Sequence, residues 1–386
     1  MNTIVNIFIR EIERLRSRSS AWVLILIIPT IIFIYLGGIY KKGGIEKVQI
    51  AILDQDQTPF SKSILTNLSA SPKVEVIKKL SADDNLESIF QKYPDIKGVY
   101  YIPNNFSKDI SQGRQVVFTV YTNSANIIYG NLLYKEAATF INTISAKITL
   151  TRLSLKGIPF DKARQMLLPV KIEARPLFNP YYNYLYYLIP GLTTVLLQMI
   201  VFFLGTRSIN SEFKDGTFTD LYDLSGRSVA KIIAGKLLCY STIGILIALF
   251  ILTVIYPFLG IPLSANAIAF LPVFLVFILA NVMLGMALSV IFNNQAIAMD
   301  MAFVYNSPAF VFSGFTFPIM AMPAFNSWYA NLIPYTHFLQ AFTKGFEMEN
   351  SILTTAPQII NLLIFVLLAY VICSTLLMYK TQKLRQ

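Results

Sequence analysis

The sequence predicts an α-helical membrane protein with six transmembrane helices, a re-entrant hairpin after the fifth, and one inserted extracytoplasmic α/β domain. Hydrophobic residues make up 55% of the 386-residue chain and charged residues only 14%, a composition outside the usual range of soluble globular proteins. Six apolar stretches are each near or above the ~20 residues with which a helix crosses ~30 Å of hydrocarbon. A segment of mixed polarity, residues 41–180, separates the first stretch from the second.

The six stretches contain almost no charged residues, which lipid-facing helices cannot easily carry. In chain order, the expected elements are a cytoplasmic interfacial helix (1–18), the first crossing (19–40), the extracytoplasmic domain (41–180), the second crossing (181–207), a cytoplasmic segment (208–231), the third (232–257), fourth (267–291) and fifth (296–318) crossings, a re-entrant external segment (319–345) and the sixth crossing (356–379).

The positions of Lys and Arg predict the orientation in the membrane, because these residues favour short cytoplasmic loops. Residues 258–266 contain neither, and residues 319–355 contain only Lys344. On the other side, the basic residues are Arg10, Arg14, Arg16, Arg18, Arg207, Lys214, Arg227, Lys231, Lys236, Lys380, Lys383 and Arg385. Both termini are therefore expected in the cytoplasm. The net charge of +11 fits a membrane surface better than nucleic acid.

The first crossing is expected to be an uncleaved signal anchor, because it is long and no small-residue cleavage site follows it. Before it, Ile4, Phe8, Ile12 and Leu15 recur at helical spacing, with Arg and Glu on other faces. That pattern predicts a helix lying in the membrane interface. The alternative is a plain cytoplasmic extension of the first crossing.

The inserted segment alternates between strand and helix patterns, which predicts βαβ units and a small α/β sheet. The expected strands are 48–54, 74–80, 98–103, 115–123 and 170–177, and the expected helices are 59–69, 83–93, 106–112 and 127–156. The last helix is long and amphipathic, with one apolar face formed by Leu133, Ala137, Phe140, Ile144 and Ile148.

No catalytic, cofactor-binding or metal-binding residue is predicted. The inserted segment has no His and no Gly-rich phosphate loop, and Asp54-Gln55-Asp56 lacks the Gly and the closing Glu of a calcium loop, so a surface turn is expected there. Residues 230–237 lack the first glycine and the final hydroxyl of a P-loop. Any ATP hydrolysis must therefore come from another chain. Cys239 and Cys373 lie in predicted crossings and give no disulfide framework.

Two isolated ionisable residues invite a functional interpretation. Asp300 is the only acid inside a predicted crossing. It could serve a proton or a substrate, but an interfacial carboxylate at the positive end of a helix dipole is favoured. His337, the only histidine, is expected to be an interfacial polar tip, because one His makes no metal site.

Two segments are more specific. The first runs from Ser208 to Leu221 in the predicted cytoplasmic segment and continues to Gly235-Lys236. The second runs from Ser313 to Phe338, contains aromatic residues, and is broken by Pro318, Pro323 and Pro334. Irregular backbone at membrane depth survives only when it is packed in protein or lines a cavity. The second segment therefore predicts a re-entrant hairpin at the outer face. Gly314 is expected to allow a close approach of helices there, and Phe315, Phe317, Trp328 and Tyr335 are expected to anchor the turn at the membrane interface.

In these segments the chain resembles the permeases of ABC-2 type transporters. The family pattern E-x-x-x-G-T-x-x-x-L followed by G-K is matched by Glu212, Gly216, Thr217, Leu221, Gly235 and Lys236. A second family pattern is matched by Ser313, Gly314, Phe317, Pro318, Met322, Pro323, Pro334, Thr336 and Phe338. The chain departs from the family at Ser225-Gly226, where many members have Thr-Pro, and at Lys344-Gly345, where Arg-Gly is frequent.

The resemblance implies the membrane-spanning permease subunit of an ATP-driven exporter in the inner membrane of a bacterium, with drugs or lipophilic compounds as cargo. Its implied partners are the lipid bilayer, a separate ABC ATPase subunit, a second permease subunit (identical or related) and a periplasmic adaptor. It implies ATPase coupling through Glu212, Gly216, Thr217 and Leu221. It also implies a re-entrant gate formed by Ser313, Gly314, Phe317, Pro318, Met322, Pro323 and Pro334.

Two alternatives stay open. A receptor or surface protein that does not transport could act through its external domain, although it would not need a segment for coupling to an ATPase. A permease for polysaccharide or another polymer is the second alternative, although that branch usually lacks the large external domain.

Overall fold

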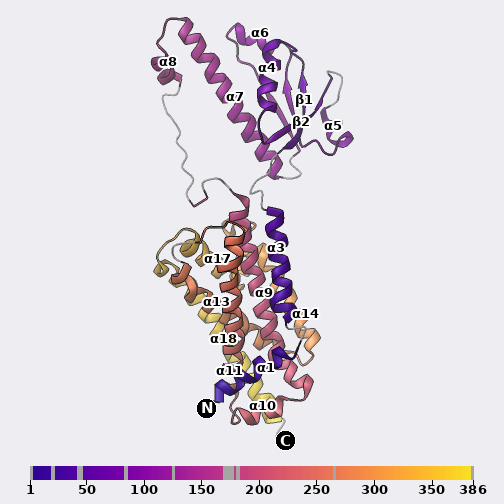
Figure 1. Cartoon of the computed structure of the whole chain (residues 1–386), viewed down its shortest axis with the longest axis vertical. Helices are drawn as coiled ribbons and strands as arrows, with labels where there is room; N and C mark the ends of the chain where they lie inside the picture. Colours follow the sequence, from indigo (N-terminus) through magenta and orange to yellow (C-terminus); the bar gives the residue numbers. More distant parts are fainter. Residues whose placement is uncertain are drawn as a thin grey trace. The chain divides into compact units, whose positions relative to one another are not determined.

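The computed structural model describes residues 3–18, 22–40, 47–81, 86–123, 127–167, 178–179, 183–263 and 267–383. The chain forms two compact units (Figure 1). The membrane unit comprises Met1–Gly43 and Pro176–Gln386, and the inserted unit comprises Gly44–Arg175. The membrane unit is helical, and the inserted unit combines helices with a small mixed sheet.

Among the described residues, four helical spans are long and apolar enough to cross a membrane. They correspond to the second, third, fourth and sixth predicted crossings. They are formed by α9 (Tyr184–Asp215), by α11 (Val229–Phe250) with η2 (Ile251–Ile255) and α12 (Tyr256–Phe258), by α13 (Ala267–Ile291), and by η5 (Ile352–Thr355) with α18 (Ala356–Lys383).

The other two predicted crossings correspond to shorter helices. The first contains a π-helix, η1 (Val23–Ile27), continued by α3 (Ile28–Tyr40), and residues 19–21 lie outside the described part. The fifth is divided into α14 (Gln295–Asn306) and α15 (Ala309–Phe312). The break lies at Ser307 and Pro308, where proline removes a backbone donor from the helix. A total of six crossings therefore stays a prediction.

Helix α9 is the central element of the membrane unit and packs against α13, α11, α14 and α3. Its contact with α13 is made backbone to backbone at two glycines. A Cβ atom on Gly205 would lie 2.4 Å from the carbonyl oxygen of Val282, and one on Gly285 would lie 2.3 Å from that of Phe202. Such close crossings are typical of small residues in membrane helices. They make α9 and α13 one rigid pair.

Helix α9 extends about two turns into the segment that was predicted to follow the second crossing. It ends at Asp215, because Gly216 adopts a left-handed conformation (φ 71°) that closes the helix. A short helix, α10 (Phe218–Leu224), follows. The N-terminal helix α1 (Thr3–Arg16) packs against α11 and α10.

The inserted unit contains a four-stranded sheet in the order β2-β1-β3-β4. The strands are β1 (Val48–Asp54), β2 (Val74–Lys79), β3 (Gly98–Ile102) and β4 (Thr119–Thr122). Strand β1 pairs in parallel with β2 and β3, whereas β3 and β4 are antiparallel. The helices are α4 (Pro59–Ser69), α5 (Leu86–Lys92), α6 (Phe106–Ser111), α7 (Ile127–Leu155) and α8 (Phe160–Leu167).

The long helix α7 lies beside the sheet (Figure 1) and buries the face that its sequence predicts. Leu133 and Ala137 are buried against β1 and β3, and Phe140 packs beside them. Helix α5 covers the other face of the sheet through Ile89. The α/β prediction is confirmed for these elements, while the predicted strand 170–177 lies outside the described residues.

Candidate functional site

A buried group of charged residues lies where α1, α9 and α11 meet. This ionic cluster consists of Arg10, Glu11 and Arg14 from α1, Glu212 from α9, and Lys236 from α11. Glu11 is 2% exposed, and Glu212 and Lys236 are fully buried. Charged residues are almost never fully buried unless they are paired. The cluster therefore ties three segments together that are far apart in the sequence.

Lys236 is at the centre of the cluster. Its Nζ donates to Glu11 Oε1 at 2.5 Å, to Glu212 Oε1 at 2.9 Å, and to the backbone oxygen of Ser208 at 3.1 Å. An ammonium group has three N–H donors, and all three are used here. The buried charge is thus both neutralised and fully hydrogen-bonded.

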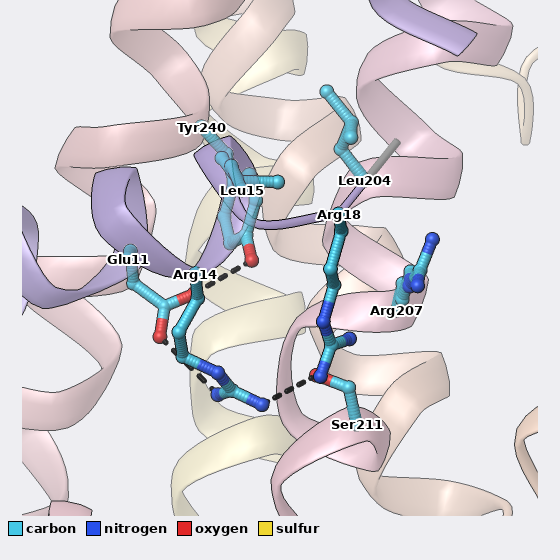
Figure 2. Close-up of a pocket in the computed structure, with 8 residues that line it drawn as sticks. All are labelled: Glu11, Arg14, Leu15, Arg18, Leu204, Arg207, Ser211 and Tyr240. Atoms are coloured by element: carbon cyan, nitrogen blue, oxygen red, sulfur yellow. Dashed lines mark hydrogen bonds and ion pairs between the residues drawn. The ribbon is translucent and has the colours of Figure 1, made fainter. Parts of the chain in front are cut away.

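Glu11 links α1 to α11 through both of its oxygens. Its Oε2 accepts a hydrogen bond from the hydroxyl of Tyr240 at 2.8 Å, and Figure 2 shows this contact together with that to Arg14. Burial alone would raise the pKa of Glu11. The charge of Lys236 and the hydrogen bonds from Lys236 and Tyr240 outweigh burial and lower the pKa below its usual value. Glu11 is therefore held as a carboxylate.

Glu212 joins the ionic cluster to the family pattern that contains it. Arg10 binds its carboxylate with two hydrogen bonds of 2.7 and 3.0 Å, and Arg14 also contacts it. The hydroxyl of Thr217 donates to Oε2 at 2.5 Å. Paired Arg–carboxylate hydrogen bonds are among the strongest in proteins and fix orientation. Two of the four predicted coupling residues, Glu212 and Thr217, are thus in direct contact.

The adjacent Gly235 explains why α1 can reach α11. A Cβ atom at Gly235 would lie 2.6 Å from Ile7 Cγ2 and 3.2 Å from the backbone oxygen of Ile4. The Gly-Lys pair therefore has two physical roles. Gly235 makes room for α1, and Lys236 binds it.

The sequence predicts that the N-terminal helix lies in the membrane interface with Ile4, Phe8, Ile12 and Leu15 on one apolar face, and this stays a prediction. Within the membrane unit, α1 buries Ile7 and Glu11, whereas Ile12 is 38% exposed. The side of α1 that contacts α9 and α11 is set by ion pairs, which hydrophobic periodicity does not predict.

The two remaining coupling residues shape the turn and the short helix after α9. Gly216 caps α9, and the N–H of Thr217 donates to the backbone oxygen of Glu212 at 2.9 Å. Leu221 is fully buried and Phe218 is 4% exposed. The rings of Phe218 and Phe213 are stacked, with their centroids 4.3 Å apart. Helix α10 is thereby fixed to α9. Its outward face exposes Thr219, Asp220, Asp223 and Leu224.

Replacing Gly216 with valine should strain this turn, because a side chain in the left-handed region costs roughly 1–2 kcal/mol. No heavy atom lies within 4 Å of a Cβ built at Gly216, so the backbone alone causes the effect. Gly216→Asn is the matched control, since asparagine tolerates this conformation. We expect Val, but not Asn, to lower the thermal unfolding midpoint. Equal behaviour of the two variants would contradict this role of the turn.

A small cavity borders the ionic cluster between Glu11, Arg14, Arg18, Arg207 and Ser211 (Figure 2). Its volume is about 20 Å³, which leaves space for about one water molecule. It is therefore no ligand site. Arg14 and Arg18 both bind Asp215 beside it, which extends the ion pairs to the last turn of α9.

The predicted hairpin segment folds back onto the other end of α9. A Cβ atom on Gly191 would lie 2.1 Å from the ring of Phe315. The ring of Tyr187 stacks on Phe315 with centroids 5.2 Å apart, and its hydroxyl donates to the Phe315 oxygen at 2.5 Å. Tyr335 donates to the backbone oxygen of Gly191 at 2.7 Å. The contact is therefore specific, because it combines ring packing with two hydrogen bonds.

The predicted gate residues are distributed along this segment, which continues through η3 (Ile319–Ala321), α16 (Ala324–Ala330), α17 (Pro334–Phe342) and η4 (Thr343–Glu347). Ser313 is buried, Gly314 forms a turn with φ 94°, and Phe317 is 51% exposed. Pro318, Pro323 and Pro334 stand at the starts of η3, α16 and α17, with Met322 between the first two helices.

Three expectations about this segment are corrected. Gly314 has a positive φ, which glycine adopts without strain, and it does not lie at a close approach of two helices. Phe315 and Tyr335 are buried at 7% and 0% exposure and are not interface anchors, whereas Phe317 and Trp328 are exposed. Gly191 leaves room on α9 for the ring of Phe315. The sequence shows that this segment contains aromatic residues, but not which of them are buried in the protein.

Two residues that the sequence singled out, Asp54 and His337, make structural hydrogen bonds. Asp54 accepts backbone N–H groups from Asp56 and Gln57 and the hydroxyl of Ser61, so it stabilises a turn. His337 is not an interfacial tip. It is 6% exposed, and its nitrogens contact the backbone oxygen of Asn331 at 2.9 Å and the Asn361 amide at 3.2 Å.

Asp300 is exposed on α14. Within the described ranges, no three His, Cys, Asp or Glu residues are grouped so that they could hold a metal ion.

The sequence interpretation missed Glu11 and Tyr240 as members of the site. It placed Lys236 in the family pattern and among the basic residues near membrane ends, but gave its charge no partner. A signal was present, because Lys236 lies inside the apolar stretch 232–257. An ionisable residue in such a stretch needs a partner.

The comparisons with known proteins extend over nearly the whole chain. Residues 19–374 match the family described as ABC-2 family transporter protein. The chain is also similar to the "Probable multidrug ABC transporter permease YbhS" of Escherichia coli strain K12. The two are 22% identical over 355 residues, which cover 89% of this chain and 88% of the relative. The protein of the same name from Escherichia coli O157:H7 matches equally.

Proposed function

Because the chain belongs to the ABC-2 transporter family, we propose that it is the permease subunit of an ATP-driven exporter whose ATPase is a separate chain. The family makes it a multi-pass membrane transport protein, and permease components of ABC transporters are not enzymes themselves. The observation that carries the proposal is the ionic cluster. It binds α1 and α11 to the end of α9, next to the exposed face of α10.

In this proposal, the ATPase docks on α10 and pushes on it during its cycle. Phe218 and Leu221 are buried between α10 and its neighbours, so a push on α10 reaches α9. The ion pairs of Glu212 with Arg10 and Lys236 couple the same movement to α1 and α11. The movement of α9 then reaches its N-terminal end, where Phe315 of the predicted hairpin segment packs on Gly191.

The names of the relatives support a proposal for the cargo. Both relatives are named "Probable multidrug ABC transporter permease YbhS", and we propose drugs or lipophilic compounds as the substrate class of this chain. We further propose the bacterial inner membrane as the location, with both termini in the cytoplasm. A second permease subunit, identical or related, would complete the path, and a periplasmic adaptor could receive the cargo.

The proposal is tested with the chain and its ATPase partner reconstituted together in proteoliposomes. External ATP should drive accumulation of a fluorescent lipophilic dye inside the proteoliposomes, through the complexes whose ATPase faces outward. An ATPase partner without catalytic activity should abolish this accumulation. Glu212→Arg should abolish accumulation while the permease still inserts, because it places a cation among Arg10, Arg14 and Lys236. Absent accumulation in a well-folded complex would favour the receptor alternative, and ATP-independent accumulation would contradict ATP-driven export.

The topology gives an independent test. A cysteine at Ser111, which is exposed in the inserted unit, should react with an impermeant maleimide in intact spheroplasts. A cysteine at Asp223, exposed on α10, should react only after lysis. The native Cys239 and Cys373 are buried and should contribute little background. The reverse pattern of labelling would exclude an exporter with α10 in the cytoplasm.

A further inference from the structure

A larger cavity, of about 360 Å³, lies in the membrane unit at the end of α9 opposite the ionic cluster. Its lining residues lie in four segments of the chain: residues 178–179, 186–190, 256–263 and 342–349. Small-molecule sites in proteins have volumes of roughly 300–1,000 Å³. The cavity is therefore large enough for a small organic molecule.

Aromatic rings form much of the wall. Phe342 and Phe346 are stacked with centroids 4.7 Å apart, and Phe270 packs behind both at 5.8 and 5.9 Å. Tyr256, on another wall, is fully buried and holds its hydroxyl 3.3 Å from that of Thr193. Phe342, Phe346 and Tyr256 are 1%, 5% and 0% exposed, so they support the wall from behind. The aromatic side chains that are open to the cavity are Phe178 and Tyr187, which are 60% and 48% exposed.

The polar side chains of the cavity include two carboxylates, Glu347 and Glu349. Glu347 forms no ion pair with a described residue. Its neighbour Lys344 has Nζ 3.1 Å from the side-chain amide of Gln358. Glu347 is exposed at the rim, yet the apolar surroundings raise the pKa of its carboxyl, against a smaller effect of the hydrogen bond with Thr343. A carboxylate in such surroundings is stabilised by a nearby cation.

The charge and backbone around the cavity point the same way. The described residues that line the cavity include two carboxylates and no Lys or Arg, so no cation of the lining opposes a bound cation. Two residues that line the cavity, Phe178 and Glu349, have positive φ values of 64° and 54°. Left-handed backbone at residues other than glycine is strained, and such strain concentrates at functional sites.

We propose that this cavity binds lipophilic organic cations of the quaternary ammonium class. The faces of aromatic rings attract such cations, and cages of aromatic residues are known to recognise them. Glu347 supplies the compensating charge, whereas an anion would be repelled and a neutral molecule would gain nothing from it. Binding rests on the cavity and not on the proposed export, so it is measurable without an ATPase or nucleotide.

The test uses the purified full-length protein in nanodiscs of phosphatidylglycerol. Radiolabelled benzyltrimethylammonium should bind saturably, and excess unlabelled compound should displace it. Its neutral isostere, neopentylbenzene, has a carbon in place of the nitrogen and should not displace it. The same measurement in nanodiscs that contain phosphatidylcholine, whose head group is a quaternary ammonium, distinguishes two sources of the ligand. If phosphatidylcholine lowers the binding of benzyltrimethylammonium, the site also binds a lipid head group. If binding is unchanged, the site binds a soluble cation.

Two variants test the residues. Glu347→Gln removes the charge at constant size and should weaken binding at least tenfold. Tyr186→Leu removes a lining aromatic ring and should weaken binding severalfold, while Tyr184→Leu, on the same helix turn but outside the lining, should bind normally. Elution as a single peak on gel filtration checks folding of each variant. Wild-type affinity in both Glu347→Gln and Tyr186→Leu, or equal displacement by the neutral isostere, would overturn the proposal.

Discussion

Replacing Lys236 with methionine is expected to destabilise the membrane unit by about 3–5 kcal/mol, the usual cost of removing one partner from a buried ion pair. The substitution leaves Glu11, 2% exposed, without its principal cation, while methionine keeps most of the volume. The measurement is the thermal unfolding midpoint of the purified protein in detergent. The same variant should lose stimulation of the partner ATPase, since α1 would no longer be held on α11.

Two further variants separate the ion pair from a general effect of charge. Lys231→Met changes an exposed lysine on the same helix and should leave the unfolding midpoint nearly unchanged. The double variant Glu11→Leu/Lys236→Met replaces the pair with apolar residues and should recover most of the lost stability, because such replacements are often neutral. Additive losses in the double variant would show that Glu11 and Lys236 do not stabilise α1 as a pair.

Elements that depend on hydrophobic periodicity and length were predictable from the sequence. The strand Val48–Asp54 and the helix Pro59–Ser69 have the predicted bounds, and Leu133 and Ala137 lie on the predicted face of α7. The four long spans were also visible, because a long stretch without charges has few other uses.

Contacts between distant charges were not predictable in the same way. The sequence identified Glu212 by resemblance, but two partners of its carboxylate, Arg10 and Arg14, lie on α1, about two hundred positions earlier in the chain. Nor did the pattern place the end of α9, because residues 208–215 are polar yet still helical and largely buried. A single sequence shows that such residues need partners without showing which ones they have.

The second large effect is expected at Gly191, where valine should displace the predicted hairpin segment from α9. Its Cβ atom would overlap the ring of Phe315, and a β-branched side chain cannot turn away from the contact. The ring would lose its stacking on Tyr187 and the Tyr187 hydrogen bond to its backbone oxygen. We expect a loss of about 1–3 kcal/mol in stability, as for other overpacked sites. Export should fall at least tenfold.

Gly38→Val is the matched control, because Gly38 also lies in an apolar helix but no atom lies within 4 Å of a Cβ built there. A cysteine at the exposed Thr316 reports on the segment directly. It should react faster with a maleimide in the Gly191→Val background than in the Gly38→Val background, since the displaced segment loses its support. If Gly191→Val exports normally while Thr316→Cys labelling accelerates, the segment moves without controlling the path, and its role as a gate is wrong. If neither changes, the contact between Gly191 and Phe315 does not hold the hairpin in place.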